Sequence, residues 1–202
     1  MHILEYPPVP VTAPIYEGFP HHAKIDVHGN TFHGPHQGFV VELLTPAGIA
    51  MHASLRMGHE FCTVFNSMEG TMWGVEERVH SVLRPGQHFH MHVKNDHHHF
   101  TIKINGCHVA HFRHRVPCGM ITAVHIRGDV TIEKIHFEGF RHHNHGGGVY
   151  VAPAPVVVAA PPPPVIMAAP APTVIIEEHA KTSPEPLVTD RYHKTLRRFG
   201  NS

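Results

Sequence analysis

The sequence has few cysteines, no long apolar run and no excess of charge of either sign. Three cysteines among 202 residues are too few for a disulfide framework, which favours synthesis in a reducing compartment. No run approaches the roughly 18 apolar residues that a membrane-spanning helix needs. Lysine plus arginine and aspartate plus glutamate both number 16, so the charge does not predict a nucleic-acid partner. Residues 1–8 lack the pattern of a secretory signal. We therefore expect a soluble protein made in the cytoplasm.

Histidine is the residue type in excess, with 25 copies. The net charge, zero when histidine is neutral, would rise steeply as the pH falls through about 6.5. His88, His90 and His92 alternate along an expected strand, and imidazoles on one strand face can converge on Zn²⁺ or Cu²⁺. A metal- or pH-responsive protein is therefore one hypothesis that the composition leaves open.

Composition divides the chain into three segments. Residues 1–13 are an N-terminal extension, residues 14–140 carry short strand patterns, and residues 141–202 are a His/Gly linker followed by a tail rich in Pro, Ala and Val. Proline fixes φ and removes a backbone donor, so we expect this tail to be disordered. Residues 189–199 have a cap and an apolar stripe, but a helix of that length is marginal alone, which favours a frayed terminus.

Apolar residues between positions 14 and 140 recur with a period of two. Residues 49–56, for example, place apolar side chains on one side and His52, Ser54 and Arg56 on the other, which is typical of a half-buried strand. Asn105-Gly106 separates two such runs and predicts a tight hairpin with positive φ at both turn residues. With no long amphipathic pattern, the fold class that we expect is all-β: a two-sheet antiparallel sandwich.

Polar and aromatic residues on these expected strands suggest a sugar-binding face. An aromatic side chain can lie against the apolar face of a pyranose, while imidazole, amide and guanidinium groups hold its hydroxyls. The candidate carbohydrate-binding residues are His52, Ser54, Arg56, Asn66, Trp73, Glu76 and Arg78. Each of them alone has an ordinary alternative, since polar strand faces are usually just solvated and a tryptophan usually packs. Their order and spacing together favour a site.

This set of motifs resembles the galectins, the β-galactoside-binding lectins, over about residues 14–140. The family pattern His-Phe-Asn-Pro-Arg reads His-Ala-Ser-Leu-Arg at residues 52–56, an asparagine follows at Asn66, and Trp-Gly-x-Glu-x-Arg occupies residues 73–78. The resemblance implies a jelly-roll sandwich in which a concave sheet binds the sugar without a metal or other cofactor. It also implies that the strand of His88 to His92 lies on the convex sheet behind.

The roles implied by the resemblance suit the chemistry of a hexose. His52 and Arg56 would contact the axial hydroxyl that distinguishes galactose, Asn66 and Glu76 would take the next hydroxyl, and Trp73 would stack on the ring. Glu76, together with Arg78, would also pair with Arg56 and hold its guanidinium in place before the ligand arrives.

Ser54 is the main departure from the family pattern, which has asparagine there. Serine is shorter and would leave a gap or a water, and one lost neutral hydrogen bond costs roughly 0.5 to 1.5 kcal/mol, or about 2- to 13-fold in affinity. Two neighbours, Ala53 and Leu55, also differ from the family's phenylalanine and proline. Spacing does not decide whether His59 contacts ligand.

The preferred hypothesis is a non-enzymatic lectin that binds β-galactoside glycans and glycoconjugates. No nucleophile elbow or phosphate-binding glycine loop supports an enzyme. Self-association into a homo-oligomer, through a sheet edge or the tail, would supply avidity, and the resemblance implies export by a route that needs no signal peptide. The alternatives are a galectin-fold protein-interaction module with weakened sugar binding and the His-rich metal- or pH-responsive protein.

Overall fold

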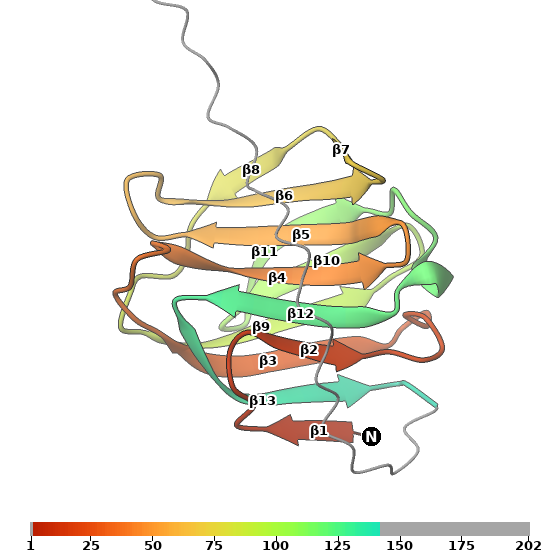
Figure 1. Ribbon diagram of the computed structural model, residues 1–202, viewed down its shortest axis with the longest axis horizontal. Coiled ribbons are helices and arrows are strands. Elements are labelled where there is room, and N and C mark those ends of the chain that lie inside the picture. The colour runs from red at the N-terminus through yellow and green to blue at the C-terminus, as the bar shows by residue number, and fades with distance from the viewer. Residues whose placement is uncertain (1, 142–202) are drawn as a thin grey trace, which may run out of the picture. The chain divides into compact units, whose positions relative to one another are not determined.

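The computed structural model describes residues 2–141, and they form two antiparallel sheets (Figure 1). The only helical element among these residues is a 3-10 turn, η1 (Cys118–Met120). The expected all-β sandwich is therefore confirmed. No helix in this part of the chain is long and apolar enough to cross a membrane. The proposed tail, including the segment 189–199, lies outside the described residues.

One sheet has six strands and the other has seven. The six-stranded sheet, called the back sheet below, has the order β1 (His2–Glu5), β13 (Val130–Glu138), β3 (Lys24–Thr31), β9 (His88–Asn95), β10 (His99–Ile104) and β11 (Cys107–Arg113). The seven-stranded sheet, called the site sheet, has the order β2 (Val11–Pro14), β12 (Ala123–Gly128), β4 (Gly38–Thr45), β5 (Gly48–Arg56), β6 (Cys62–Glu69) and β7 (Met72–Trp73), with β8 (Glu77–His80) also paired to β6. The expected N-terminal extension thus contains β1 and most of β2, which are paired strands at the edges of the two sheets.

Local sequence signals account for much of this topology. Asn105 and Gly106 have φ of 51° and 79° and join β10 to β11 in the expected hairpin. Within β5, Met51, Ala53 and Leu55 are fully buried, so the alternating residues His52, Ser54 and Arg56 face outward. The strand β9, with its alternating histidines, lies in the back sheet and not beside β5, as the resemblance implied.

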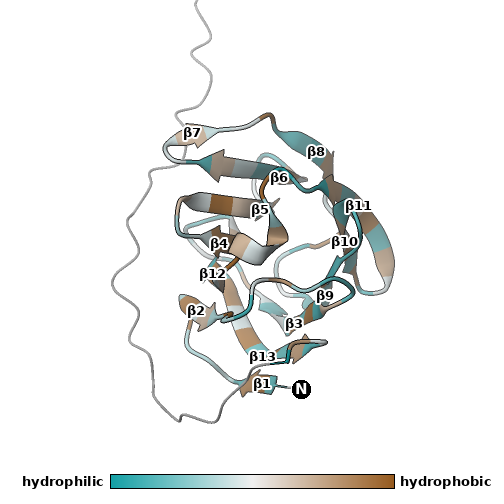
Figure 2. Ribbon diagram, turned by 90° about the vertical axis from the view of Figure 1, so that its right-hand side faces the viewer, coloured by the Kyte–Doolittle hydropathy of each residue, from teal (hydrophilic) through white to brown (hydrophobic). Residues whose placement is uncertain are grey.

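Aromatic pairs join the two sheets across the core. Figure 2 looks along the strands and shows the sheets as facing layers. Phe39 on β4 and Phe89 on β9 pack with ring centroids 5.0 Å apart, and Phe65 on β6 packs on Phe112 of β11 at 6.1 Å. These rings are almost completely buried, and such pairs add to the stabilisation from burial alone. The core therefore fixes β5 and β6, which carry much of the site, against the back sheet.

Candidate carbohydrate-binding site

The candidate residues lie on or beside neighbouring strands of the site sheet. His52, Ser54 and Arg56 are on β5, Asn66 is on β6, Trp73 on β7, Glu76 between β7 and β8, and Arg78 on β8. The register places His52 opposite Asn66, and Val64 between Ser54 and Arg78. Because directly opposed residues point to the same side of a sheet, these positions share one face.

His52 and Trp73 form the aromatic part of this face. Their ring centroids are 5.0 Å apart with the planes at 76°, so the imidazole meets the indole edge-on. Trp73 is partly exposed and is absent from the buried core. The indole therefore remains accessible from outside the sheet, as stacking against a sugar requires.

Glu42, on β4, fixes the orientation of His52. Its Oε1 lies 2.7 Å from Nδ1 of His52 and 3.4 Å from Nη2 of Arg127, and the residue is only 5% exposed. Burial raises the pKa of Glu42, but the hydrogen bond and charge of His52 and the charge of Arg127 outweigh burial and lower it overall. With Nδ1 engaged by this carboxylate, Nε2 is the ring nitrogen of His52 left for a contact with a hydroxyl group. No sequence pattern indicated a role for Glu42 in the site.

Two carboxylates, those of Glu60 and Glu76, hold Arg56 and Arg78 in a chain of ion pairs that runs Arg56, Glu60, Arg78, Glu76. Arg56 is hydrogen-bonded to Glu60, Glu60 lies 3.5 Å from Nη1 of Arg78, and Arg78 donates from Nε to Glu76 at 2.9 Å. The hydrogen bond from Arg56 lowers the pKa of Glu60, and the one to Glu76 raises the pKa of Arg78. The expectation that Glu76 and Arg78 pair directly with Arg56 was wrong in detail: the carboxylate on Arg56 is Glu60, which links it to Arg78.

His59 and Glu60, which are neighbours in the loop after β5, have different surroundings. His59 lines a hollow together with Phe32, Gln37 and Met57, whereas the next residue, Glu60, reaches the guanidinium groups of the site face. The loop residue that contacts the site face is therefore Glu60. The alternating pattern that predicts β5 ends at Arg56, so it could not indicate a role for Glu60.

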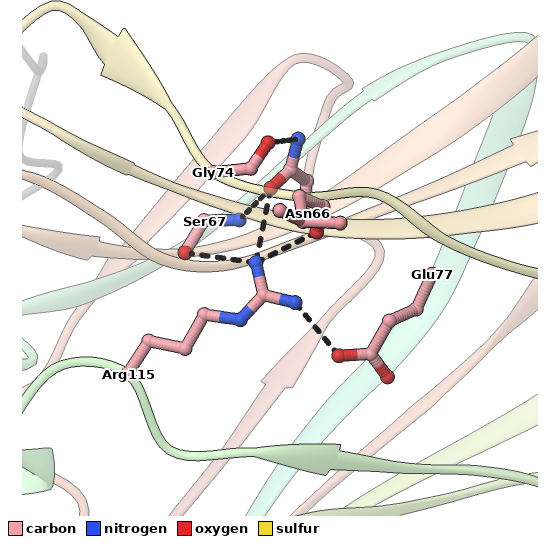
Figure 3. A network of polar contacts seen from close by, with 6 residues as sticks. Asn66, Ser67, Gly74, Glu77 and Arg115 are labelled. Carbon is pink, nitrogen blue, oxygen red and sulfur yellow. Dashed lines mark hydrogen bonds and ion pairs between the residues drawn. The ribbon is translucent and has the colours of Figure 1, made fainter.

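Asn66 is buried, and its amide is used within the protein (Figure 3). It is 4% exposed, its Oδ1 accepts hydrogen bonds from the backbone of Ser67 at 2.8 Å and from Arg115 at 3.2 Å, and its Nδ2 donates to the carbonyl of Gly74 at 3.0 Å. An amide nitrogen carries two hydrogens, and the contact with Gly74 uses one of them. Asn66 thus positions the segment that begins at Trp73.

Arg115, just beyond the end of β11, supports the same segment from the back sheet. Its Nη1 donates to the carbonyl of Val75 at 2.8 Å and its Nη2 to Glu77 at 2.7 Å (Figure 3), and its guanidinium lies 4.7 Å above the ring of Phe112. A Cβ at Gly74 would meet Nη1 of Arg115 at 2.8 Å, so glycine leaves the space that the guanidinium occupies. No sequence pattern indicated a role for Arg115 in the site.

A two-sheet antiparallel sandwich that displays an accessible indole, an oriented imidazole and fixed guanidinium groups on one sheet face is the arrangement of a sugar-binding lectin domain. The model of the galactoside-binding lectin family matches residues 10–137. The chain belongs to this family.

Individual relatives agree with the family assignment. Probable galaptin lec-8 of Caenorhabditis elegans is 30% identical over 168 residues, which cover 76% of this chain and 93% of that protein. Galectin-4 of Rattus norvegicus is 31% identical over 105 residues, or 52% of this chain and 32% of that longer protein. The crystal structure of C. elegans galectin LEC-6 superposes with a TM-score of 0.63 at 25% identity and covers 67% of this chain and 94% of its own.

Arg115→Ala is expected to weaken binding of lactose by about 2- to 13-fold. The variant removes the hydrogen bonds to the segment after Trp73, so this segment becomes ordered only when the sugar binds. The free-energy cost of ordering one side chain on binding is roughly 0.5 to 1.5 kcal/mol. Calorimetric titration with lactose measures the change. Arg113→Ala removes the same charge from an exposed position on the same stretch and should have little effect, whereas equal affinities for Arg115→Ala and the unmodified protein would contradict a supporting role.

Proposed function

We propose that the outer face of the site sheet binds the β-galactoside ends of glycans. The proposed contact residues are His52, Ser54, Arg56, Asn66, Trp73, Glu76 and Arg78. The observation that carries the proposal is the edge-on pairing of Trp73 with His52, which sets an accessible indole next to an imidazole oriented by a buried carboxylate. The family assignment supplies the class of sugar.

Each proposed contact residue recognises a different part of the sugar ring. Trp73 stacks on the apolar face of the ring, and Nε2 of His52 and the guanidinium of Arg56 meet at the axial hydroxyl, which an epimer would direct elsewhere. Because Glu60 already holds Arg56, little rotamer entropy is lost on binding. Asn66 contributes its one remaining amide hydrogen, and Glu76 and Arg78 complete the polar side of the groove.

The proposed activity is reversible and non-catalytic, and it uses no metal or other cofactor, since the side chains themselves supply the donors and acceptors that hydroxyl groups need. One or two sugar rings make few contacts, so the affinity of a single site is on the order of µM to mM. Cross-linking of glycans would then require a second site, which a homo-oligomer supplies through avidity.

We also propose residues 14–140 as the carbohydrate-recognition domain, with β1 and β2 adding edge strands to its sheets. Cys62, Cys107 and Cys118 are all free thiols, which supports synthesis in the cytoplasm and, if the protein leaves the cell, export that avoids an oxidising compartment.

A lactose titration followed by the fluorescence of Trp73 tests the proposal, because Trp73 is the only tryptophan. A saturable change is expected with lactose and none with cellobiose, a disaccharide that lacks the axial hydroxyl. The absence of any change at about 50 mM lactose, a concentration well above the expected dissociation constants, would count against the lectin function.

A protein-interaction module is the second candidate, and the apolar surroundings of Trp73 favour it. Met72 and Val75, on either side, are 75% and 80% exposed, and clusters of exposed apolar side chains mark interaction surfaces. Two results together would favour this module over the lectin: no fluorescence change in the lactose titration, and binding of a protein partner that the Met72→Ser substitution abolishes.

Ser54→Asn is expected to tighten lactose binding by about 2- to 13-fold. The longer amide can both donate and accept, so it can make directly the neutral hydrogen bond, worth roughly 0.5 to 1.5 kcal/mol, that the shorter hydroxyl of serine makes only through a water. Calorimetry on the two proteins measures the gain. Ser54→Ala, the control, should change affinity little, and no gain from asparagine would show that position 54 does not contact the sugar.

A further inference from the structure

The outer face of the back sheet carries a second cluster of side chains, which the sugar site does not use. Asp26 on β3 lies directly opposite His92 on β9 and His136 on β13. His90 is two residues from His92 and therefore points to the same side of β9. The register of three paired strands thus brings imidazoles to both sides of one aspartate.

The contacts around Asp26 converge on one oxygen atom. Its Oδ1 lies 2.7 Å from Nε2 of His90 and 2.8 Å from Nδ1 of His92, and the residue is 7% exposed. The ring of His28 stacks on that of His90, with centroids 4.1 Å apart and planes at 11°, which restrains the orientation of His90. The ligating atoms of Asp26, His90 and His92 all lie within 4.8 Å of one another.

We propose that Asp26, His90 and His92 bind one Zn²⁺ ion on the back sheet. Two imidazole nitrogens and a carboxylate oxygen are a ligand set for zinc, which takes such ligands at about 2.0 to 2.2 Å and can keep water in its remaining position. Ca²⁺ and Mg²⁺ prefer sites made of oxygen atoms. The nitrogen to oxygen distances need to open only by roughly 0.6 Å to reach tetrahedral ligand spacing around a bond length of about 2.1 Å.

Neighbouring groups complete the surroundings of the ion. A ligating atom of His136 and one of Glu138 lie within 4.8 Å of Asp26 and of each other, and Nε2 of His136 is buried without a hydrogen-bond partner among the described residues. Lys24 is neutralised by Glu138 at 2.8 Å, which limits repulsion of a cation. Groups of this kind around a metal orient its ligands and strengthen binding.

A second histidine cluster differs in a way that provides a control. His21, His22 and His97 also bring ligating atoms within 4.8 Å, but all three residues are exposed and no carboxylate belongs to the group. Since three exposed side chains must be ordered on binding, this cluster should bind Zn²⁺ only weakly. His97→Gln therefore removes one histidine of a surface cluster without touching the proposed site.

The test is a titration of the full chain with Zn²⁺ in competition with a chromophoric chelator. One stoichiometric, saturable site is expected, together with a weaker background from other histidines. His90→Gln and His92→Gln should each weaken the stoichiometric site by more than about tenfold, because even changes to groups that only support metal ligands cost 10- to 100-fold. His97→Gln should leave the site unchanged. Co²⁺, added alone, should give visible absorption typical of four nitrogen and oxygen ligands in the unmodified protein but not in His92→Gln.

Other outcomes overturn the proposal. Weak binding without fixed stoichiometry would show adventitious binding by surface histidines, and unchanged binding in both His90→Gln and His92→Gln would place the metal elsewhere. Thermal unfolding in EDTA and the lactose titration, run on every variant, show that each one folds. Because the proposed metal lies on the other sheet, lactose binding should be the same in EDTA and in Zn²⁺, so the sugar and metal proposals can fail separately.

Discussion

Trp73→Ala is expected to abolish retention on immobilised galactoside while leaving thermal unfolding nearly unchanged. The indole lies on a two-residue strand, packs edge-on against His52 and is partly exposed, so its removal opens no cavity in the core. An aromatic side chain at the centre of a binding site is commonly worth about 2 kcal/mol or more, which is roughly 30-fold in affinity. Because the starting affinity is on the order of µM to mM, such a loss is enough to prevent retention.

Two further variants make this experiment specific. Trp73→Phe keeps an aromatic face and should retain part of the binding, whereas Met72→Ala changes an exposed neighbour and should leave the sugar affinity unaltered. A fall in the unfolding temperature of Trp73→Ala comparable to that of a core variant would instead assign the indole a packing role.

Those parts of the fold that depend on neighbours in sequence could be predicted. The alternation in β5 and the Asn105-Gly106 turn are local, because a strand turns its side chains to opposite sides and a two-residue turn requires positive φ. The outward positions of His52, Ser54 and Arg56 follow from that alternation. The grouping of these residues with Asn66 and Trp73 came from the family resemblance and not from any local rule.

The groups that support the site could not be predicted in the same way. Arg115 contacts Asn66 across 49 positions of the chain and lies just beyond the end of a strand of the other sheet, so no pattern in either segment indicates the contact. Glu60 lies in a loop, where no periodicity constrains it. Asp26 illustrates the same limit: the alternating histidines of β9 were visible in the sequence, but their carboxylate partner is 64 and 66 positions away.

Phe65→Ala is expected to lower the free energy of unfolding by about 3 to 5 kcal/mol. Phe65 is 1% exposed, and its ring packs on Phe112, which in turn lies beneath the guanidinium of Arg115. The substitution therefore leaves a cavity between the sheets and weakens the base of the site. Urea unfolding at 25 °C measures the loss as a lower midpoint with an unchanged slope.

Phe65→Leu, the matched control, keeps most of the apolar volume and should lose clearly less stability than Phe65→Ala. A loss below about 1 kcal/mol in Phe65→Ala would mean that the site sheet collapses around the cavity at little cost. Since a ligand that binds only the folded state stabilises it by about 2.7 kcal/mol at 100 times its dissociation constant, lactose should raise the unfolding midpoint of Phe65→Ala. The same sugar should not raise the midpoint of a Phe65→Ala, Trp73→Ala double variant, because its stabilising effect depends on the site.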